Sequence, residues 1–174
     1  MTRFVAFLRA INLGPTNKIA MPALRALAEQ LGFADVRTYI NSGNLLFGAA
    51  GTEETLASAL EQAIAEEFGL RIDVAVRTED HLRRLLAANP FPLGDPSQVT
   101  VAFLTRIPPP EAQERVAALA DHDEPFVFSG REVWVNYRGG QGTSKLAAQF
   151  NRAVGVSSTV RTLRTVTKVV DLLG

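Results

Sequence analysis

The sequence contains no cysteine, which excludes disulfide bonds, thiolate metal ligands and cysteine nucleophiles. Its two histidines, His81 and His122, lack the spacing of metal ligands, so neither a metal site nor a cofactor is predicted. The Gly-x-Ser-x-Gly motif of serine hydrolases is also missing. The acidic pairs and triplets at residues 66–67 and 121–124 are interpreted as solvated faces. The sequence alone therefore does not decide whether the protein is an enzyme.

Long hydrophobic runs are missing as well, because no apolar stretch approaches the roughly 20 residues that a membrane-spanning helix requires. Residues 3–13 are interrupted by Arg3 and Arg9, and no signal-type cleavage region follows them. Hydrophobic residues nevertheless make up 47% of the 174 residues, which is enough for a packed core. We expect a soluble, cytoplasmic protein without a membrane partner.

Net charge is absent overall, since 18 basic residues balance 18 acidic ones, but the two signs are unevenly distributed. Residues 53–67 contain five glutamates and no lysine or arginine. Residues 131–168 contain seven lysines and arginines against Glu132 alone. The basic excess in the last third indicates either an anionic partner or a solvated basic face.

Hydrophobic periodicity in the first half predicts the order β-α-β-β-α-β. Residues 3–11 read as a strand and residues 72–77 alternate as a strand should, whereas residues 22–31 and 52–68 place apolar side chains at helical spacing. Between the two predicted helices, VRTYI and LLF flank the turn-forming tetrapeptide NSGN, which is typical of a β-hairpin.

The same order recurs after a further helix and the helix-breaking stretch NPFPLGDP. The fold class predicted is α+β, with two tandem ferredoxin-like (β-α-β-β-α-β) units and an additional C-terminal helix at about residues 164–173. The expected organisation is a first unit at residues 1–80, a connecting segment at 81–97, and a second unit at 98–174. A single larger mixed sheet is the alternative.

This topology predicts which loops share one end of a sheet. In a ferredoxin-like unit, the loop after the first strand and the turn of the hairpin lie at the same end, which brings Asn12, Asn17 and Lys18 close to the NSGN turn. In the second unit, the GGQGTSK loop of residues 139–145 is expected to face the end of the last strand. Arg161, Arg164 and Lys168 would then lie near Ser144 and Lys145.

Five segments in this order resemble one known family: RAINLGPTNKIAM, YINSGNLLF, NPFP, GGQGTSKL and TVRTLRTVTK. Together they are similar to the bacterial family called domain of unknown function 1697, over essentially the whole chain. The resemblance implies a ferredoxin-like α/β fold and no established activity. The chain departs from the usual pattern at Ala10 and Pro15, where glycines are common, and at Leu163, where tryptophan is common.

The GGQGTSK loop differs from a nucleotide-hydrolysing P-loop, because Ser144 precedes Lys145 and Leu146 follows it. Three glycines that lead into a helix still expose N–H donors at the positive end of the helix dipole, which favours an anion. The alternative is that Thr143 or Ser144 only caps the helix and the glycines form a loose connection. The predicted ligand-binding residues are Gly140, Gly142, Thr143, Ser144, Lys145, Arg161, Arg164 and Lys168.

A second polar cluster is predicted at the end of the first sheet. Its members are Asn12, Lys18, Asn41, Ser42 and Asn44. Asparagine and glycine also suit turn positions with positive φ, so this cluster is equally explained as a structural turn.

The function predicted from these features is binding of an anionic ligand, namely a nucleotide, a nucleic acid or a phosphorylated metabolite. One alternative is an enzyme that acts on a phosphorylated small molecule, and another is a structural or oligomer-forming protein without a small ligand. Aromatic and arginine side chains on the sheet face away from the helices resemble RNA-recognition sheets, but the aromatic-rich third-strand motif is missing. That face is therefore expected to pack on the other sheet or on a partner chain.

Overall fold

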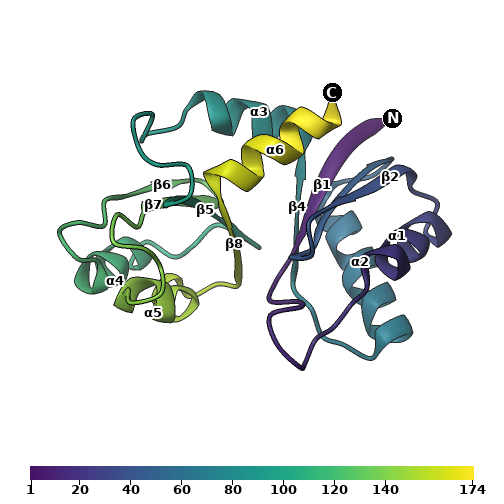
Figure 1. Ribbon diagram of the computed structural model, residues 1–174, viewed down its shortest axis with the longest axis horizontal. Coiled ribbons are helices and arrows are strands. Elements are labelled where there is room, and N and C mark those ends of the chain that lie inside the picture. Colours follow the sequence, from purple (N-terminus) through teal and green to yellow (C-terminus); the bar gives the residue numbers. More distant parts are fainter. The chain divides into compact units, whose positions relative to one another are not determined.

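The computed structural model describes residues 1–174, and its elements follow the order β-α-β-β-α-β twice, as the sequence predicted (Figure 1). The first series is β1 (Thr2–Leu8), α1 (Met21–Gln30), β2 (Ala34–Tyr39), β3 (Asn44–Ala49), α2 (Glu53–Phe68) and β4 (Val74–Thr78). The second series is β5 (Val99–Leu104), α4 (Ala112–Leu119), β6 (Phe126–Ser129), β7 (Glu132–Asn136), α5 (Lys145–Val154) and β8 (Ser158–Thr162). The remaining helices are α3 (Glu79–Ala87) and α6 (Leu163–Leu173).

The chain divides into two compact units, each with its own four-stranded antiparallel sheet. The first unit comprises Met1–Ala87 together with Lys168–Gly174, and the second comprises Ala88–Thr167. The strand orders are β2-β3-β1-β4 and β6-β7-β5-β8. The fold is thus mixed α+β with two sheets, and the alternative of one larger mixed sheet does not hold.

The last seven residues belong to the first unit, although the sequence-based division placed the whole last helix in the second half. Arg3 on β1 contacts this segment, since its Nη1 donates a hydrogen bond to the Leu173 carbonyl oxygen at the end of α6. Val169, Val170 and Leu173 of the same segment are buried. The Nε atom of Arg3 lies 2.6 Å from the Glu79 carboxylate, which Arg83 also contacts at 2.7 Å. A cation at a helix C-terminus also interacts favourably with the helix dipole.

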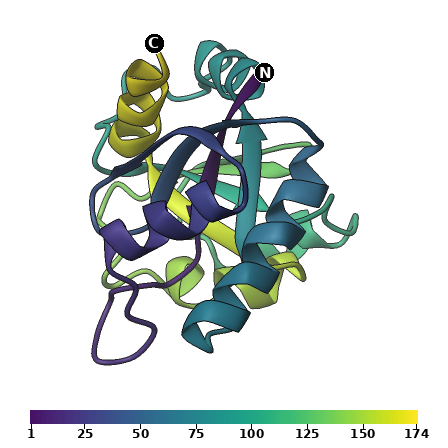
Figure 2. The same cartoon turned by 90° about the vertical axis from the view of Figure 1, so that its right-hand side faces the viewer.

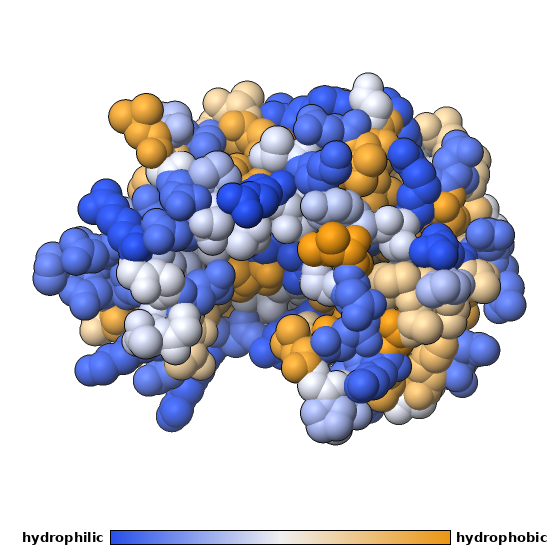
Figure 3. Space-filling view, in the orientation of Figure 1, coloured by the Kyte–Doolittle hydropathy of each residue, from blue (hydrophilic) through white to orange (hydrophobic).

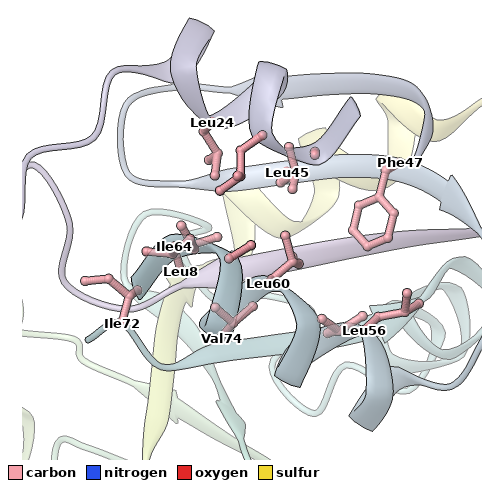
Figure 4. Packing of buried hydrophobic residues seen from close by; sticks show 14 of the residues in the cluster. Leu8, Leu24, Leu45, Phe47, Leu56, Leu60, Ile64, Ile72 and Val74 are labelled. Atoms are coloured by element: carbon pink, nitrogen blue, oxygen red, sulfur yellow. The ribbon is translucent and has the colours of Figure 1, made fainter. Parts of the chain in front are cut away.

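The core of the first unit lies between its sheet and the helices α1 and α2, which cover the same face (Figures 1 and 2). Figure 4 shows side chains from both helices pointing toward those of the strands, among them Leu24, Leu45 and Leu60. Helix α2 begins at a capping box, in which Thr52 accepts from the Thr55 N–H and Thr55 accepts from the Thr52 N–H. The capping box and the spacing of the buried leucines therefore both favour a helix that begins at Glu53.

The second unit builds its core in the same way, with α4 and α5 on one face of the sheet. Leu146 and Phe150 of α5 and Val116 of α4 pack against Val133 and Val135 of β7. The β6–β7 hairpin turns at Gly130, which has φ +58°, and Ser129 pairs with Glu132 across the turn. The second half thus also contains the hairpin that the recurring element order requires.

No helix is both long and apolar enough to cross a membrane. On the face shown in Figure 3, hydrophilic side chains divide the hydrophobic ones into several separate groups.

The carboxyl group of Glu61 on α2 should make the free energy of unfolding depend on pH. Burial raises the pKa of its carboxyl above the ordinary value of 4.5, the nearby Asp73 charge adds to the rise, and a hydrogen bond from the Val74 N–H opposes it. Just above pH 4.5 the folded chain therefore retains a proton that the unfolded chain has lost, so the free energy of unfolding falls as the pH rises through this window.

Glu61→Gln should remove this decrease while keeping an acceptor for the Val74 N–H. The variant should gain stability relative to the wild type between pH 4 and pH 7, by less than about 1 kcal/mol because solvent screens the half-exposed carboxyl. Urea denaturation at both pH values measures the gain. The control is Glu67→Gln, an exposed position on the same helix, and an equal gain there would contradict the assignment to Glu61.

Candidate functional site

The first candidate site is a hollow of about 490 Å³ at the end of the first sheet, which we call the first-loop hollow. The loop between β1 and α1 forms most of its wall, and the β2–β3 turn completes it. Its lining residues are Asn12, Leu13, Gly14, Lys18, Ile19, Ala20 and Asn41. The sequence-based prediction that the first loop lies near the hairpin turn is therefore confirmed.

Asn12 joins the two parts of this wall through its side-chain amide. Its Nδ2 donates to the carbonyl oxygens of Ile19 at 2.9 Å and Asn41 at 2.8 Å, and its Oδ1 accepts from the Ile19 N–H at 2.9 Å. The Asn12 N–H also donates to the Asn17 carbonyl, which closes the loop on itself. Asn12 therefore fixes the β1–α1 loop against the β2–β3 turn, the two segments that line the hollow.

Asn44 and Ser42 have a different place from the one predicted. Asn44 is fully buried as the first residue of β3, and its Nδ2 donates to the Tyr39 carbonyl and to the Ser42 hydroxyl. Neither residue lines the hollow. Ser42 belongs to the hairpin turn of residues 40–43, and Asn44 connects the two sides of that turn through its hydrogen bonds. For these two residues the structural turn explains the sequence pattern.

The backbone around the first-loop hollow contains four non-glycine residues in the left-handed region. They are Ala10 (φ +54°), Asn12 (φ +58°), Asn17 (φ +54°) and Ile40 (φ +49°). Asparagine tolerates this conformation, whereas alanine and above all a β-branched isoleucine do not adopt it without cost. Strained backbone of this kind concentrates at binding and catalytic sites.

The electrostatic environment of the first-loop hollow is positive. The N-cap of helix α1 is Ala20, which has no side-chain acceptor for the first N–H groups, and the first turn contains no acidic residue. The exposed Lys18 forms no hydrogen bond or ion pair in the chain. The uncapped N-terminus of α1 and the unpaired Lys18 ammonium group thus lie at the same hollow, and no carboxylate lines it.

The second candidate site is a hollow of about 620 Å³ in the second unit, which we call the α5 hollow. Four of the predicted residues line it: Gly140, Thr143, Ser144 and Lys145, whereas the exposed Gly142 does not. The Ser144 hydroxyl accepts a hydrogen bond from the Ala147 N–H at 3.1 Å, so Ser144 is the N-cap of α5. The capping role considered from the sequence is confirmed.

The opposite wall of the α5 hollow is acidic, because Asp121, Asp123 and Glu124 line it together with the end of α4. Only Arg138 and Lys145 bring positive charge to the lining. Glu124 is 8% exposed, so the interpretation of the whole acidic segment as a solvated face is wrong at this residue. The acidic wall does not favour a ligand that carries negative charge alone.

Three predicted basic residues lie outside the α5 hollow. Val160 packs against the core that α4 and α5 cover, and alternation along β8 therefore turns Arg161 to the opposite face of the sheet. Burial lowers the pKa of Arg161 to about 10, and its Nη1 donates to the Val160 carbonyl. Arg161 therefore does not line the α5 hollow with Ser144, because one residue of register decides which face a strand side chain occupies.

Arg164 and Lys168 are also missing from the lining of the α5 hollow. The Arg164 N–H donates to the Pro96 carbonyl at 3.0 Å. Hydrogen bonds from the Ser97 N–H and hydroxyl lower the pKa of the Asp95 carboxyl, and the charge of Arg164 adds to this effect. Lys168 belongs to the first unit. The basic excess of the last third is therefore not one cluster.

The family model described as "Protein of unknown function (DUF1697)" matches residues 1–134. The chain belongs to the DUF1697 family. The match includes the first-loop hollow and ends at Trp134, before the GGQGTSK loop. No curated protein matches this DUF1697 chain.

A solved structure of another protein resembles the DUF1697 chain along its whole length. It is the conserved bacterial protein SP0830 from Streptococcus pneumoniae, with a TM-score of 0.77, 22% sequence identity and 99% of each chain covered. At this identity the likeness establishes the fold alone.

Two features of these sites were not predicted. Glu124 was recognisable as acidic, but its burial and its hydrogen bond from the Asp121 N–H at 2.9 Å belong to the folded chain. The positive φ of Ala10 had a signal in the resemblance to the family, which implies glycine at that position, because glycine adopts positive φ readily.

Proposed function

We propose that the protein binds a small molecule with a phosphate or carboxylate group in the first-loop hollow. The observation that carries this proposal is the combination, at one wall, of an α1 N-terminus without a side-chain cap and the unpaired Lys18. Helix N-termini bind anions through free N–H groups and the helix dipole. The amide of Asn41, which lies in the same lining, supplies a further hydrogen-bonding group.

The size and charge of the first-loop hollow favour a small ligand over a nucleic acid. Its volume of about 490 Å³ lies in the range of small-molecule sites. Lys18 is the single cation in the lining, whereas a nucleic acid requires several cations that neutralise successive phosphates. Nucleotides and phosphorylated metabolites are therefore the ligand classes that fit, and nucleic acid is the alternative that the test must separate.

We further propose that the α5 hollow is a second ligand site, formed by Gly140, Thr143, Ser144 and Lys145. Its support is the hollow itself and the two cations in its lining, Arg138 after β7 and Lys145 at the start of α5. We also infer that each unit is a ferredoxin-like fold, which is supported by the element order and by the strand orders β2-β3-β1-β4 and β6-β7-β5-β8.

A thermal-shift screen tests the main proposal, because a ligand that binds only the folded state raises the melting temperature. The probes are inorganic phosphate, nucleotides, sugar phosphates, dicarboxylates and a short RNA. We expect at least one small anion to raise the melting temperature of the wild type. Lys18→Ala should weaken the affinity for that anion about tenfold, as expected for the loss of a charge-assisted hydrogen bond, and should reduce the shift accordingly.

Lys145→Ala is the matched control, since it removes the same charge at the other hollow. Retention of the shift in Lys145→Ala and its loss in Lys18→Ala would place the anion in the first-loop hollow. The reverse result would refute that placement. A shift produced only by RNA, with a steep dependence on salt, would replace the small ligand by a nucleic acid.

A further inference from the structure

We propose that the α5 hollow binds a zwitterionic small molecule, with an ammonium group against Glu124 and a phosphate or carboxylate group at the start of α5. This inference rests on the proposed second ligand site and is independent of the first-loop hollow.

The buried Glu124 carboxylate has no cationic partner within the chain. Glu124 is 8% exposed and lines the hollow. Its Oε1 accepts one hydrogen bond, from the Asp121 N–H at 2.9 Å, and it forms no ion pair with any lysine, arginine or histidine. A buried carboxylate is costly unless it is paired, and an ammonium group in the hollow would pair it.

The neighbouring carboxylates are in a different situation. Asp121 and Asp123 are exposed, and His122 lies between them, with its Nδ1 2.7 Å from Asp121 and its Nε2 3.7 Å from Asp123. Tyr137 is 2% exposed, and its hydroxyl has no hydrogen-bond partner. Burial raises the pKa of this phenol, and the nearby Glu124 charge raises it further. Within the acidic wall, Glu124 is therefore the carboxylate left for a ligand.

The backbone of the two helices reinforces this polarity. The hollow is lined on one side by Ala118 and Leu119, at the C-terminal end of α4, and on the other by Ser144 and Lys145, at the N-terminal end of α5. A helix C-terminus favours a cation and a helix N-terminus favours an anion. At the α4 end both the side chains and the helix dipole are negative, and at the α5 end both Lys145 and the helix dipole are positive.

Three probes test the inference. O-phosphoethanolamine contains both charged groups, ethyl phosphate contains the anion alone, and ethylammonium contains the cation alone. Titration of the ¹⁵N-labelled full chain, followed through the amides of residues 139–147, gives each affinity and its location. We expect O-phosphoethanolamine to bind about tenfold more tightly than either single-group probe, because it satisfies both walls at once. Equal binding of O-phosphoethanolamine and ethyl phosphate would overturn the inference and leave the second site standing.

Glu124→Gln provides the residue-level test, since glutamine keeps an acceptor for the Asp121 N–H and removes the charge. O-phosphoethanolamine should then bind no more tightly than ethyl phosphate, whose own affinity should stay the same or rise. Asp123→Asn is the control, and it should preserve the tenfold preference within about twofold because Asp123 is exposed. Failure of every phosphate probe to perturb residues 139–147 would reject the second ligand site itself.

Discussion

Gly43→Ala should destabilise the first unit by about 3 kcal/mol or more, because two costs coincide at this position. Gly43 has φ +87° in the turn of the β2–β3 hairpin. A β-carbon there would lie 2.7 Å from Cδ1 of Ile11 and 2.9 Å from the β-carbon of Leu8, both in the core. The Gly43 carbonyl also accepts a hydrogen bond from the Leu8 N–H at 2.9 Å, so the turn cannot shift without losing that bond.

Gly32→Ala is the matched control for this prediction. Gly32 has the same φ of +87°, but a β-carbon there meets no atom within 4 Å. The control should therefore cost only about 1 kcal/mol, from backbone strain alone. Urea denaturation followed by far-ultraviolet circular dichroism measures both variants. Equal losses would show that the contact with Ile11 and Leu8 does not matter.

Asn12→Ala should cost about 2–3 kcal/mol and should also abolish anion binding in the first-loop hollow. The substitution removes two donated hydrogen bonds, to Ile19 and Asn41, and the acceptor of the Ile19 N–H. Two of these backbone groups are partly buried, so water replaces the lost partner poorly. Because the same amide joins the loop to the hairpin turn, the walls of the hollow should separate.

Asn17→Ala separates the hydrogen bonds of Asn12 from its backbone conformation. Asn17 has φ +54°, close to the +58° of Asn12, but its side chain forms no hydrogen bond. We expect a loss of about 1 kcal/mol or less and retained binding of phosphate ligands. If Asn17→Ala weakened binding as strongly as Asn12→Ala, the role given to the Asn12 amide would be incorrect.

The sequence predicted the element order because hydrophobic periodicity and turn residues agree in both halves. Leu56, Leu60 and Ile64 recur at helical spacing, and all three are buried on the face of α2 that meets the sheet. Topology then predicted that Asn12 approaches Asn41, since only the order of elements is needed to place both loops at one end. Features that follow from connectivity and periodicity were therefore accessible from the sequence.

Features that depend on strand register and tertiary packing could not be predicted from the sequence. Arg161 and Val160 are adjacent, and nothing in STVRT indicates which of them faces the helices. Glu124 is buried while its neighbour Asp123 is exposed, a difference that arises from the turn after α4. Residues 168–174 belong to the first unit, where Arg3 contacts Leu173 across 170 positions of the sequence. Two of these features concern predicted site residues, Arg161 and Lys168.

Binding of a small anion in the first-loop hollow, at the start of α1, is best tested by titrating the ¹⁵N-labelled chain with inorganic phosphate. The titration is done at constant ionic strength, in the wild type and in Lys18→Ala. We expect saturable shifts at the amides of Lys18, Met21 and Ala23 in the wild type and much weaker ones in the variant. Shifts that are absent from these amides, or unchanged by Lys18→Ala, would contradict this expectation.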